Sequence, residues 1–415
     1  MKSRTKLFLI VAIVAVIEFS MASCGDSGSG DNSSPPHTHT LTKTNAVVAT
    51  CTLPGHPDYW TCTGCGKYYA DASGATELTM AQIVIAAGHT PGAAATCIAP
   101  QTCTGCGSVI QAAFGHDFSG TWATTGIIIK TCQRNGCTEI HSISDEMASI
   151  PAGTFTMGPD IWNTDTGGDD TFSVTLSAFK MSKYTVTQEL YQAVMGNNPS
   201  YFQASNGESP DETELQSKRP VEIVSWYDAI LFCNRLSIRE NLTLAYSVKV
   251  GGTEISWNTV TAPAAGDSDW NNATTVSGST GYRLPTDAQW EYACRGGSTS
   301  DYWCFGDTEA NLVDYAWYSA NSGSKTHEVG KKNANAYGLY DMHGNVWEWC
   351  WDLYADYPAG PVTDYEGSGI GKYGVDRVVR GGGWIDLAEY TRSVFRFYCI
   401  PDFRYYSIGF RVVRP

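Results

Sequence analysis

Cysteine and histidine recur in a repeated unit between residues 46 and 143. Each full copy has a leading cysteine, a Cys-x-x-Cys pair and a trailing histidine. Thiolate and imidazole ligands at such spacing are typical of tetrahedral zinc sites. The predicted ligands are Cys51, Cys62, Cys65 and His89 in the first copy, and Cys97, Cys103, Cys106 and His116 in the second. A third, degenerate copy keeps Cys132, Cys137 and His141.

Disulfides are the alternative, because exported proteins usually pair their cysteines. A unit of about 35 residues is too small to fold on its own core, so zinc or disulfides are expected to hold it together. The fourth ligand of each zinc site is either one of the trailing histidines or His37 or His39, and the sequence leaves both alternatives open. Catalysis is not expected in this segment, and its expected role is that of a spacer.

The chain ends in a segment where aromatic residues alternate with arginines. Exposed aromatic side chains with arginine are typical of binding hot spots, and several side by side lower solubility unless a ligand covers them. We therefore predict a ligand-binding face and no catalytic residues there. Its predicted residues are Trp384, Ile385, Asp386, Leu387, Tyr390, Thr391, Phe397, Cys399, Tyr405, Tyr406 and Ser407. The scaffold between the face residues is predicted to consist of Gly382–Trp384, Arg392, Ser393, Arg396 and Gly409–Arg411.

Composition excludes several other classes of function. The chain has 415 residues, enough for two or three domains, and 42% of them are hydrophobic, enough for a substantial core. The 42 glycines, 12% aromatic content and 17% charged content are typical of a loop-rich extracytoplasmic protein. A net charge of −15 argues against nucleic acid as a partner, because phosphate binding needs clustered cations.

The N-terminus has the pattern of an export signal. Lys2, Arg4 and Lys6 precede the apolar run 7–17, which is too short to span a bilayer as a stable helix. The run leads to Met-Ala-Ser-Cys24, which resembles a bacterial lipoprotein signal, with an ordinary secretion signal as the alternative. The expectation is a signal peptide over 1–23, a lipid on Cys24, and a flexible tether over 24–45. We therefore expect the protein to be held in the cell envelope by a lipid anchor, on the outer membrane and facing the exterior.

Local signals predict three helices in the remainder. One runs over 188–195, a second begins after Ser225 with Asp228 in its first turn, and a third opens at the capping box Thr286–Gln289. Alternating patterns predict strands over 154–157 and 172–179. The Gly-, Thr- and Asn-rich insertion over 241–280 is expected to be a surface loop.

Five motifs then point to one family. They are 150–158 (IPAGTFTMG), 282–293 (YRLPTDAQWEYA), 338–349 (GLYDMHGNVWEW), 377–384 (RVVRGGGW) and 408–413 (IGFRVV). Over 145–415 the chain resembles the formylglycine-generating-enzyme (sulfatase-modifying-factor) family. The resemblance implies an α+β, C-type-lectin-like fold with little regular secondary structure. It also implies that the last strand, within 408–413, closes the fold near 154–157.

The resemblance implies a calcium site as well. The family's ligands map to Asp341, the carbonyls of Gly344 and Val346, and Glu348; Asn311 maps to part of a second calcium site. Carboxylates and carbonyls are the oxygen ligands that calcium prefers. The alternative is that these groups only hydrogen-bond within a tryptophan-rich loop.

The family's oxidase activity uses copper(I) held by two cysteines, and those positions are Asp386 and Thr391 here. Cys399 is the only cysteine of this tail, and one thiol cannot form a two-coordinate site unless Cys294 or Cys350 meets it. Copper is therefore not expected. A formylglycine-generating oxidase acting on a cysteine of sulfatase-type substrates is kept as the alternative function.

Domains with this C-terminal pattern also resemble the variable proteins of diversity-generating retroelements, in which adenines of asparagine codons are randomised. Apart from Trp384, every predicted face residue can be reached from an asparagine codon by changing adenines only. The sequence thus predicts a surface-displayed lipoprotein that binds a protein or other surface ligand through a face that is either diversified or fixed. A purely structural envelope protein is a third possibility.

Overall fold

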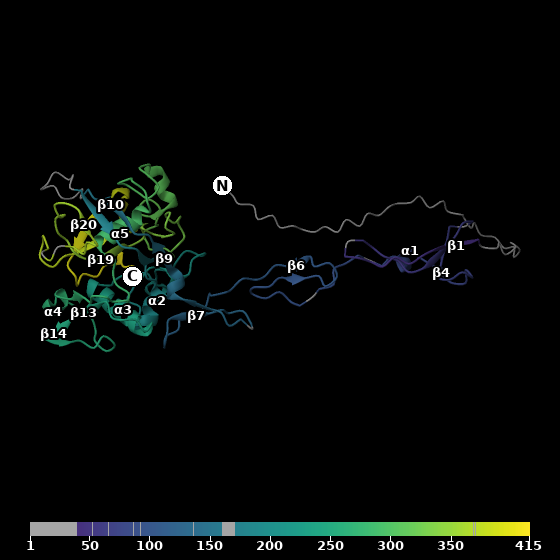
Figure 1. The fold of residues 1–415 in the computed structure, drawn as a ribbon, viewed down its shortest axis with the longest axis horizontal. Coiled ribbons are helices and arrows are strands. Elements are labelled where there is room, and N and C mark those ends of the chain that lie inside the picture. Colours follow the sequence, from purple (N-terminus) through teal and green to yellow (C-terminus); the bar gives the residue numbers. More distant parts are fainter. Residues whose placement is uncertain are drawn as a thin grey trace. The chain divides into compact units, whose positions relative to one another are not determined.

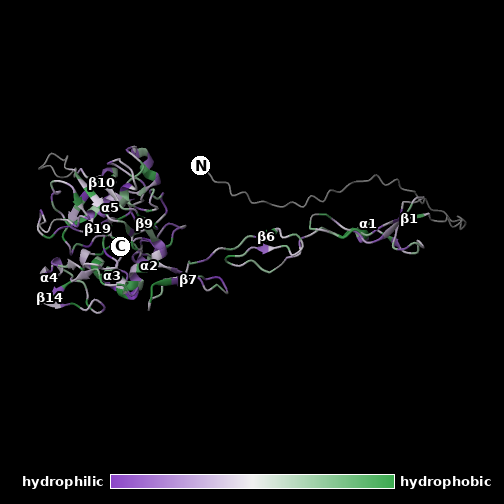
Figure 2. Cartoon of the chain, in the orientation of Figure 1, coloured by the Kyte–Doolittle hydropathy of each residue, from purple (hydrophilic) through white to green (hydrophobic). Residues whose placement is uncertain are grey.

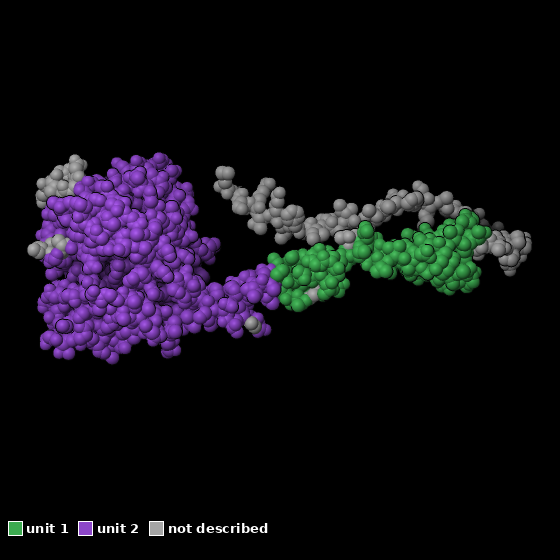
Figure 3. Space-filling model, in the orientation of Figure 1, with its two compact units in different colours: residues 1–95, 100–112 green, residues 96–99, 113–415 purple. Residues whose placement is uncertain are grey.

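The computed structural model describes residues 40–51, 53–64, 66–85, 87–91, 93–135, 137–159, 171–367, 369 and 371–415. Cys24, Cys65, His37 and His39 lie outside these ranges. The chain forms two compact units (Figure 3). The first extends to Ala95 and includes Pro100–Ala112, and the second contains Thr96–Ala99 and Ala113–Pro415.

The first unit is made of short antiparallel strands. A four-stranded sheet has the order β1 (Leu41–Thr44), β2 (Tyr59–Cys62), β3 (Tyr68–Tyr69) and β4 (Glu77–Leu78). One helical turn, α1 (Met80–Ile83), and the hairpin β5 (Gln101–Thr102) to β6 (Val109–Gln111) complete it. Its buried hydrophobic residues, among those described, are Cys62, Tyr69, Ile83, Ala95 and Cys103.

The third repeat copy belongs to the large unit. It forms the hairpin β7 (Ile129–Thr131) to β8 (Ile140–Ser142), followed by the turn η1 (Ile143–Glu146). Trp122 and Ile128 are buried in the same core as helices α2 and α3. Arg239 donates to the carbonyls of Gly126 (2.7 Å) and Ala123 (2.9 Å). The compact unit therefore begins well before residue 145.

The three predicted helices are present with the predicted caps. They are α2 (Gln188–Met195), α3 (Trp226–Arg239) and α5 (Asp287–Arg295). Ser225 and Thr286 form capping boxes at the start of α3 and α5. Left-handed glycines end α2 and α5, at Gly196 and Gly296. Local side-chain chemistry was sufficient to place these ends.

The closure of the fold differs from the expectation. The last strand, β24 (Val413–Arg414), pairs with β12 (Phe179–Ser182), and β9 (Met147–Ile150) takes the other edge of β12. The segment expected as its neighbour is in β10 (Gly153–Met157), which forms a hairpin with β11 (Phe172–Leu176) beside β20 (Val362–Thr363). The predicted strand over 172–179 is thus split in two, because β11 and β12 belong to different sheets.

A four-stranded sheet carries the C-terminal motifs. Its order is β22 (Arg396–Cys399), β21 (Arg377–Arg380), β19 (Trp347–Leu353) and β23 (Ile408–Gly409). Side chains alternate between two cores, as the pleat requires. Trp347, Trp349 and Val379 belong to the first core, with α2 and α3, whereas Cys350 and Val378 belong to the second core, with α5.

The insertion over 241–280 is not a surface loop. It forms strands β13 (Tyr246–Ser247), β14 (Lys249–Val250), β15 (Thr253–Glu254) and β16 (Thr274–Thr275), and the turn α4 (Ser268–Asn271). Trp257 and Trp270 are buried in the first core, and Figure 1 shows α4 and β13 beside α3. The prediction failed because it weighed the polar composition and not these two tryptophans.

The remaining elements are short. They are η2 (Ala204–Asn206), η3 (Gln216–Lys218), η4 (Glu309–Asp314), β17 (Ala316–Trp317), β18 (His343–Gly344) and η5 (Ala388–Thr391). Hydrophobic and hydrophilic residues are interspersed along the ribbon (Figure 2). Among the described residues, no helix has the length and apolar character needed to cross a membrane.

A candidate ligand-binding face

The C-terminal sheet and the loops beside it enclose a hollow of about 420 Å³. We call it the C-terminal hollow. It contains Ile385, Asp386, Tyr390, Phe397, Cys399, Tyr405 and Ser407, seven of the eleven predicted face residues. Trp347, Val379, Phe403 and Ile408 complete the lining. Most of this surface is apolar, as in sites that bind by contact area.

Strand β22 shows how the sequence divides scaffold from face. Phe397 is 43% exposed and lines the hollow together with Cys399, two residues on. Arg396 points to the other side of the sheet, where Nε lies 2.8 Å from Asp287 and the guanidinium lies over Tyr354. The predicted scaffold role of Arg396 agrees with this geometry.

Asp386 is held at the edge of the hollow. Its Oδ2 accepts hydrogen bonds from Trp347 Nε1 (2.7 Å) and from the backbone N–H of Gly383 (2.8 Å). Burial raises the pKa of this carboxyl above its ordinary value. One fixed polar group beside an apolar surface can orient a ligand.

Aromatic side chains form a ridge along this face. The hydroxyls of Tyr405 and Tyr406 lie 2.6 Å apart, and Phe403 stacks on Tyr405 at 5.7 Å between ring centroids. Tyr201 contacts Tyr406, with ring centroids 6.0 Å apart. Tyr201 and Trp347 were not predicted as face residues, because they are distant in the chain and only tertiary folding brings them here.

Three of the predicted face residues are buried. Trp384 packs edge-on against Phe202 at 5.2 Å and donates from Nε1 to the carbonyl of Tyr406. Thr391 Oγ1 accepts from Trp303 Nε1 (3.0 Å) and donates to the carbonyl of Ala388 (2.7 Å). Both therefore support the face from within. Ser407 is buried but lines the hollow, and Leu387 is 58% exposed outside it.

Glu348, one of the predicted calcium ligands, already has hydrogen-bond partners on both carboxylate oxygens. Both carboxylate oxygens of Glu348 are used: Arg411 donates to each, Trp290 Nε1 donates to Oε2, and Thr185 donates to Oε1. Glu348 is thus the partner of a buried arginine and has no lone pair left for a cation. Asp341 keeps one buried oxygen without a hydrogen-bond partner, and burial raises its pKa to about 6.

Calcium at Asp341, with the Gly344 and Val346 carbonyls, stays a prediction that would need another ligand in place of Glu348. Asn311 lies exposed on η4.

The thiol geometry is unlike a two-cysteine copper site. Cys399 packs against the first core, whereas Cys294 and Cys350 belong to the second. Cys350 is on β19, which is separated from Cys399 on β22 by strand β21. Two strand spacings amount to about 9 Å, too far for two sulfurs to share one ion.

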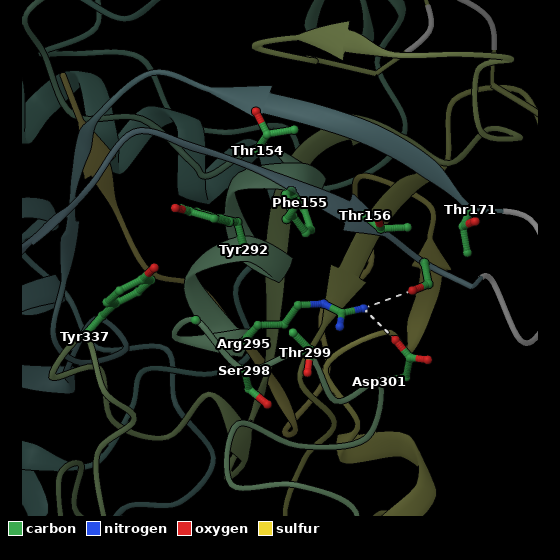
Figure 4. A pocket seen from close by; sticks show the side chains of 12 residues that line it. Thr154, Phe155, Thr156, Thr171, Tyr292, Arg295, Ser298, Thr299, Asp301 and Tyr337 are labelled. Carbon is green, nitrogen blue, oxygen red and sulfur yellow. Dashed lines mark hydrogen bonds and ion pairs between the residues drawn. The ribbon is translucent and has the colours of Figure 1, made fainter.

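A second hollow, of about 470 Å³, lies beside β10 (Figure 4). Arg295 reaches into it from α5. The guanidinium is neutralised, because Nη2 contacts Glu291 Oε1 (2.9 Å) and Asp301 Oδ1 (3.1 Å). An arginine already paired with two carboxylates offers little attraction to an anionic ligand.

The predicted Cys/His ligands are brought together across repeats. Cys103 and Cys106 of the second copy meet Cys51 and His89 of the first. Cys97 and His116 of the second copy meet Cys132 and Cys137 of the third. The predicted ligand sets each came from one copy, and the structure instead draws each set from two consecutive copies. Cys132 and Cys137 were not predicted as ligands, and both lie in the second group. Cys62 is buried and belongs to neither group.

Comparison with known proteins settles the family. Residues 138–415 match the model of the sulfatase-modifying factor enzyme 1-like domain. The chain belongs to this family. The predicted α+β, formylglycine-generating-enzyme-like fold behind small Cys/His repeats is thereby confirmed.

Three similar proteins carry names that describe different functions. The solved structure of Treponema denticola variable protein 1 is 40% identical, with a TM-score of 0.61, over 71% of this chain and 99% of that one. Chaperone protein LppX of Paenibacillus barcinonensis is 34% identical over 62% of this chain and 84% of its own length. The formylglycine-generating enzyme of Streptomyces coelicolor is 34% identical over 34% of this chain and 49% of its own length. The family resemblance and the resemblance to a variable protein are both borne out.

Proposed function

We propose that this chain is a lipid-anchored surface protein that binds a protein ligand through the C-terminal hollow. The main support for this proposal is that seven of the predicted face residues line one apolar hollow in the folded chain. Phe397 in the hollow and Leu387 outside it, in the same C-terminal segment, are exposed to solvent, although both are large and apolar. Burying each against a partner is worth about 1.5–3 kcal/mol.

The composition of the face favours a protein over a small ion. The hollow presents aromatic rings, tyrosine hydroxyls and the carboxyl of Asp386, and no cationic side chain lines it among the residues that the structure describes. Such a surface suits apolar and hydrogen-bonding side chains of a partner. The lipid anchor rests on the signal pattern that ends at Cys24, and display outside the outer membrane is part of the same proposal.

Oxidase chemistry is not favoured by these residues. The two positions that hold the copper-binding cysteines in the family's oxidases are occupied here by Asp386 and Thr391. Asp386 accepts a hydrogen bond from Trp347, and Thr391 is buried and accepts one from Trp303. We expect the purified chain to retain no copper(I) and to leave a cysteine peptide of the sulfatase type unmodified.

Substitution of the aromatic ridge tests the binding face. The full chain, with a photo-cross-linking residue at Leu387, is incubated with the solubilised surface proteins of neighbouring cells. Tyr405→Ala should reduce the cross-linked product at least tenfold, because it removes one ring from the ridge, with an unfolding midpoint close to that of the parent chain. Tyr373→Ala is the matched control, since Tyr373 is also exposed but does not line the hollow. Equal product from both variants would refute the assignment of the face.

Diversification of the face is tested at the DNA level. Codons for residues 384–411 are sequenced in many cells of the source population, together with the flanking DNA. We expect changes at the hollow-lining positions, constant codons for buried Arg396 and Arg411, and a nearby template copy with asparagine codons beside a reverse transcriptase gene. Uniform codons and no template copy would leave a fixed binding face.

A further inference from the structure

Two groups of three cysteines and one histidine lie outside the binding face. The first consists of Cys51, His89, Cys103 and Cys106, and the second of Cys97, His116, Cys132 and Cys137. Within each group the four candidate ligand atoms lie within 4.8 Å of one another. We propose that each group binds one zinc ion, with ligands drawn from two consecutive repeats.

The distances between ligand atoms suit tetrahedral zinc. With Zn–S bonds of about 2.3 Å and Zn–N bonds of about 2.0 Å, two sulfurs should be about 3.8 Å apart and a sulfur and nitrogen about 3.5 Å apart. Sγ of Cys97 and Cys132 are 3.8 Å apart, which matches this value. Those of Cys51 and Cys103 are 3.2 Å apart, closer than the tetrahedral value but near enough for both to reach one ion.

The histidine distances agree in both groups. Nδ1 of His89 lies 3.4 Å from Cys106 Sγ, and Nδ1 of His116 lies 3.4 Å from Cys137 Sγ. The two groups therefore use the same ring nitrogen in the same relation to the second cysteine of the pair.

Backbone groups around the sulfurs favour thiolates. The N–H of Gly105 points at Cys103 Sγ and that of Asp117 at Cys132 Sγ, both at 3.4 Å. N–H groups of this kind stabilise the negative charge on metal-bound sulfur. In the first group the chain turns back at Gly107, which has a φ of +72°, and its N–H donates to the carbonyl of Cys103 at 2.9 Å. Glycine suits this left-handed turn because it has no Cβ.

The structure around the first group has no hydrophobic cluster of its own among the described residues. None of the hydrophobic clusters of the described chain includes a residue before Trp122. Small units without a core need a metal or disulfides. One disulfide in each group would use two sulfurs and leave a cysteine and a histidine pointing at it, whereas one zinc ion uses all four ligands. Three thiols lose their protons when the metal binds, so binding should weaken in acid.

Zinc content of the full chain and its variants tests this proposal. Zinc is measured per chain by mass spectrometry after dialysis, and thiols are counted under denaturing conditions without reductant. Cys103→Ser and Cys132→Ser should each lose one zinc equivalent relative to the parent chain. Cys304→Ser should lose none, because Cys304 belongs to neither group. His89→Gln should lose one equivalent, or bind it much more weakly, while His56→Gln should not.

Double variants test the sharing of ligands between repeats. If the sites are shared, Cys51→Ser with Cys103→Ser disables one site and loses one equivalent, while Cys51→Ser with Cys132→Ser loses two. If each copy bound its own zinc, the first pair would disable two sites. Unchanged zinc in all variants, or thiols in both groups already oxidised to disulfides in the exported chain, would overturn the proposal. Neither result bears on the C-terminal hollow.

Discussion

Ile127 and Ile128 are neighbours in sequence with opposite surroundings. Ile127 is 48% exposed, whereas Ile128 is fully buried in the core that includes α2 and α3. Ile128→Ala should lower the free energy of unfolding of the large unit by about 2–5 kcal/mol, because it leaves a cavity in that core. Ile127→Ala should change it by no more than about 0.5 kcal/mol. Urea unfolding followed by tryptophan fluorescence measures both.

An equal effect of the two substitutions would show that the third repeat copy does not share the core of the large unit. The buried ion pair between Lys130 and Glu189, 2.6 Å apart, makes such independence hard to reconcile with the packing. Removing one partner of a buried pair leaves an uncompensated charge.

The residues of the face could be predicted in part. Composition identified Phe397 and Tyr405, because large aromatic residues between arginines suit a binding surface. It could not separate Thr391 and Trp384, which are buried, from their exposed neighbours. Their burial depends on Trp303 and Phe202, and nothing local in the sequence indicates those contacts.

The segment Ser200–Phe202 supports the face through one buried carboxylate. Glu222 accepts hydrogen bonds from the N–H groups of Tyr201 (2.9 Å) and Phe202 (3.0 Å). Burial raises the pKa of Glu222 from 4.5 to about 7. Phe202 packs against Trp384, and Tyr201 against Tyr406. Ionisation of Glu222 is therefore coupled to the stability of the ridge.

The sign of the pH effect follows from the raised pKa. Well below pH 4.5 the carboxyl is protonated in both folded and unfolded chains, so it imposes no penalty. As pH rises to about 7, the unfolded chain loses the proton more readily, and the folded chain loses about 3 kcal/mol of stability. Glu222→Gln should be less stable at pH 5, because one N–H loses its acceptor. Its stability should then fall less than that of the parent chain between pH 5 and 8.

Urea unfolding at several pH values measures this difference, and exposed Glu212→Gln serves as the control. A Glu222→Gln curve parallel to that of the parent would disprove the coupling. Taking the difference between variant and parent removes the effect of other buried acids such as Asp341, whose pKa is also raised.

Local elements were predictable where the signal is local. The capping boxes at Ser225 and Thr286 marked the starts of two helices, since a cap satisfies N–H groups within one turn. Strand partners were not predictable in the same way. The pairing of β24 with β12 joins residues more than two hundred positions apart, and neither strand carries a mark of its partner.

At the scale of the molecule, the same limit applies to the Cys/His groups. The residue types identified a zinc or disulfide site, but not which copy supplies which ligand. Ligand sets within one copy and sets shared between two copies contain the same residue types, so only the folded structure distinguishes these two arrangements. Sharing of ligands between copies also explains why the third copy can lose its leading cysteine, with Thr125 at that position, and still complete a site with Cys132 and Cys137.

The overlap of the two groups along the chain has a consequence for proteolysis. The first group links positions 51 to 106 and the second links 97 to 137, so each begins or ends inside the span of the other. With both metal ions bound, a single cut anywhere between 51 and 137 is bridged by at least one of them. After one cleavage between these positions by an extracellular protease, the binding domain would stay attached to its anchor, and it would be released there only when the metal is also removed.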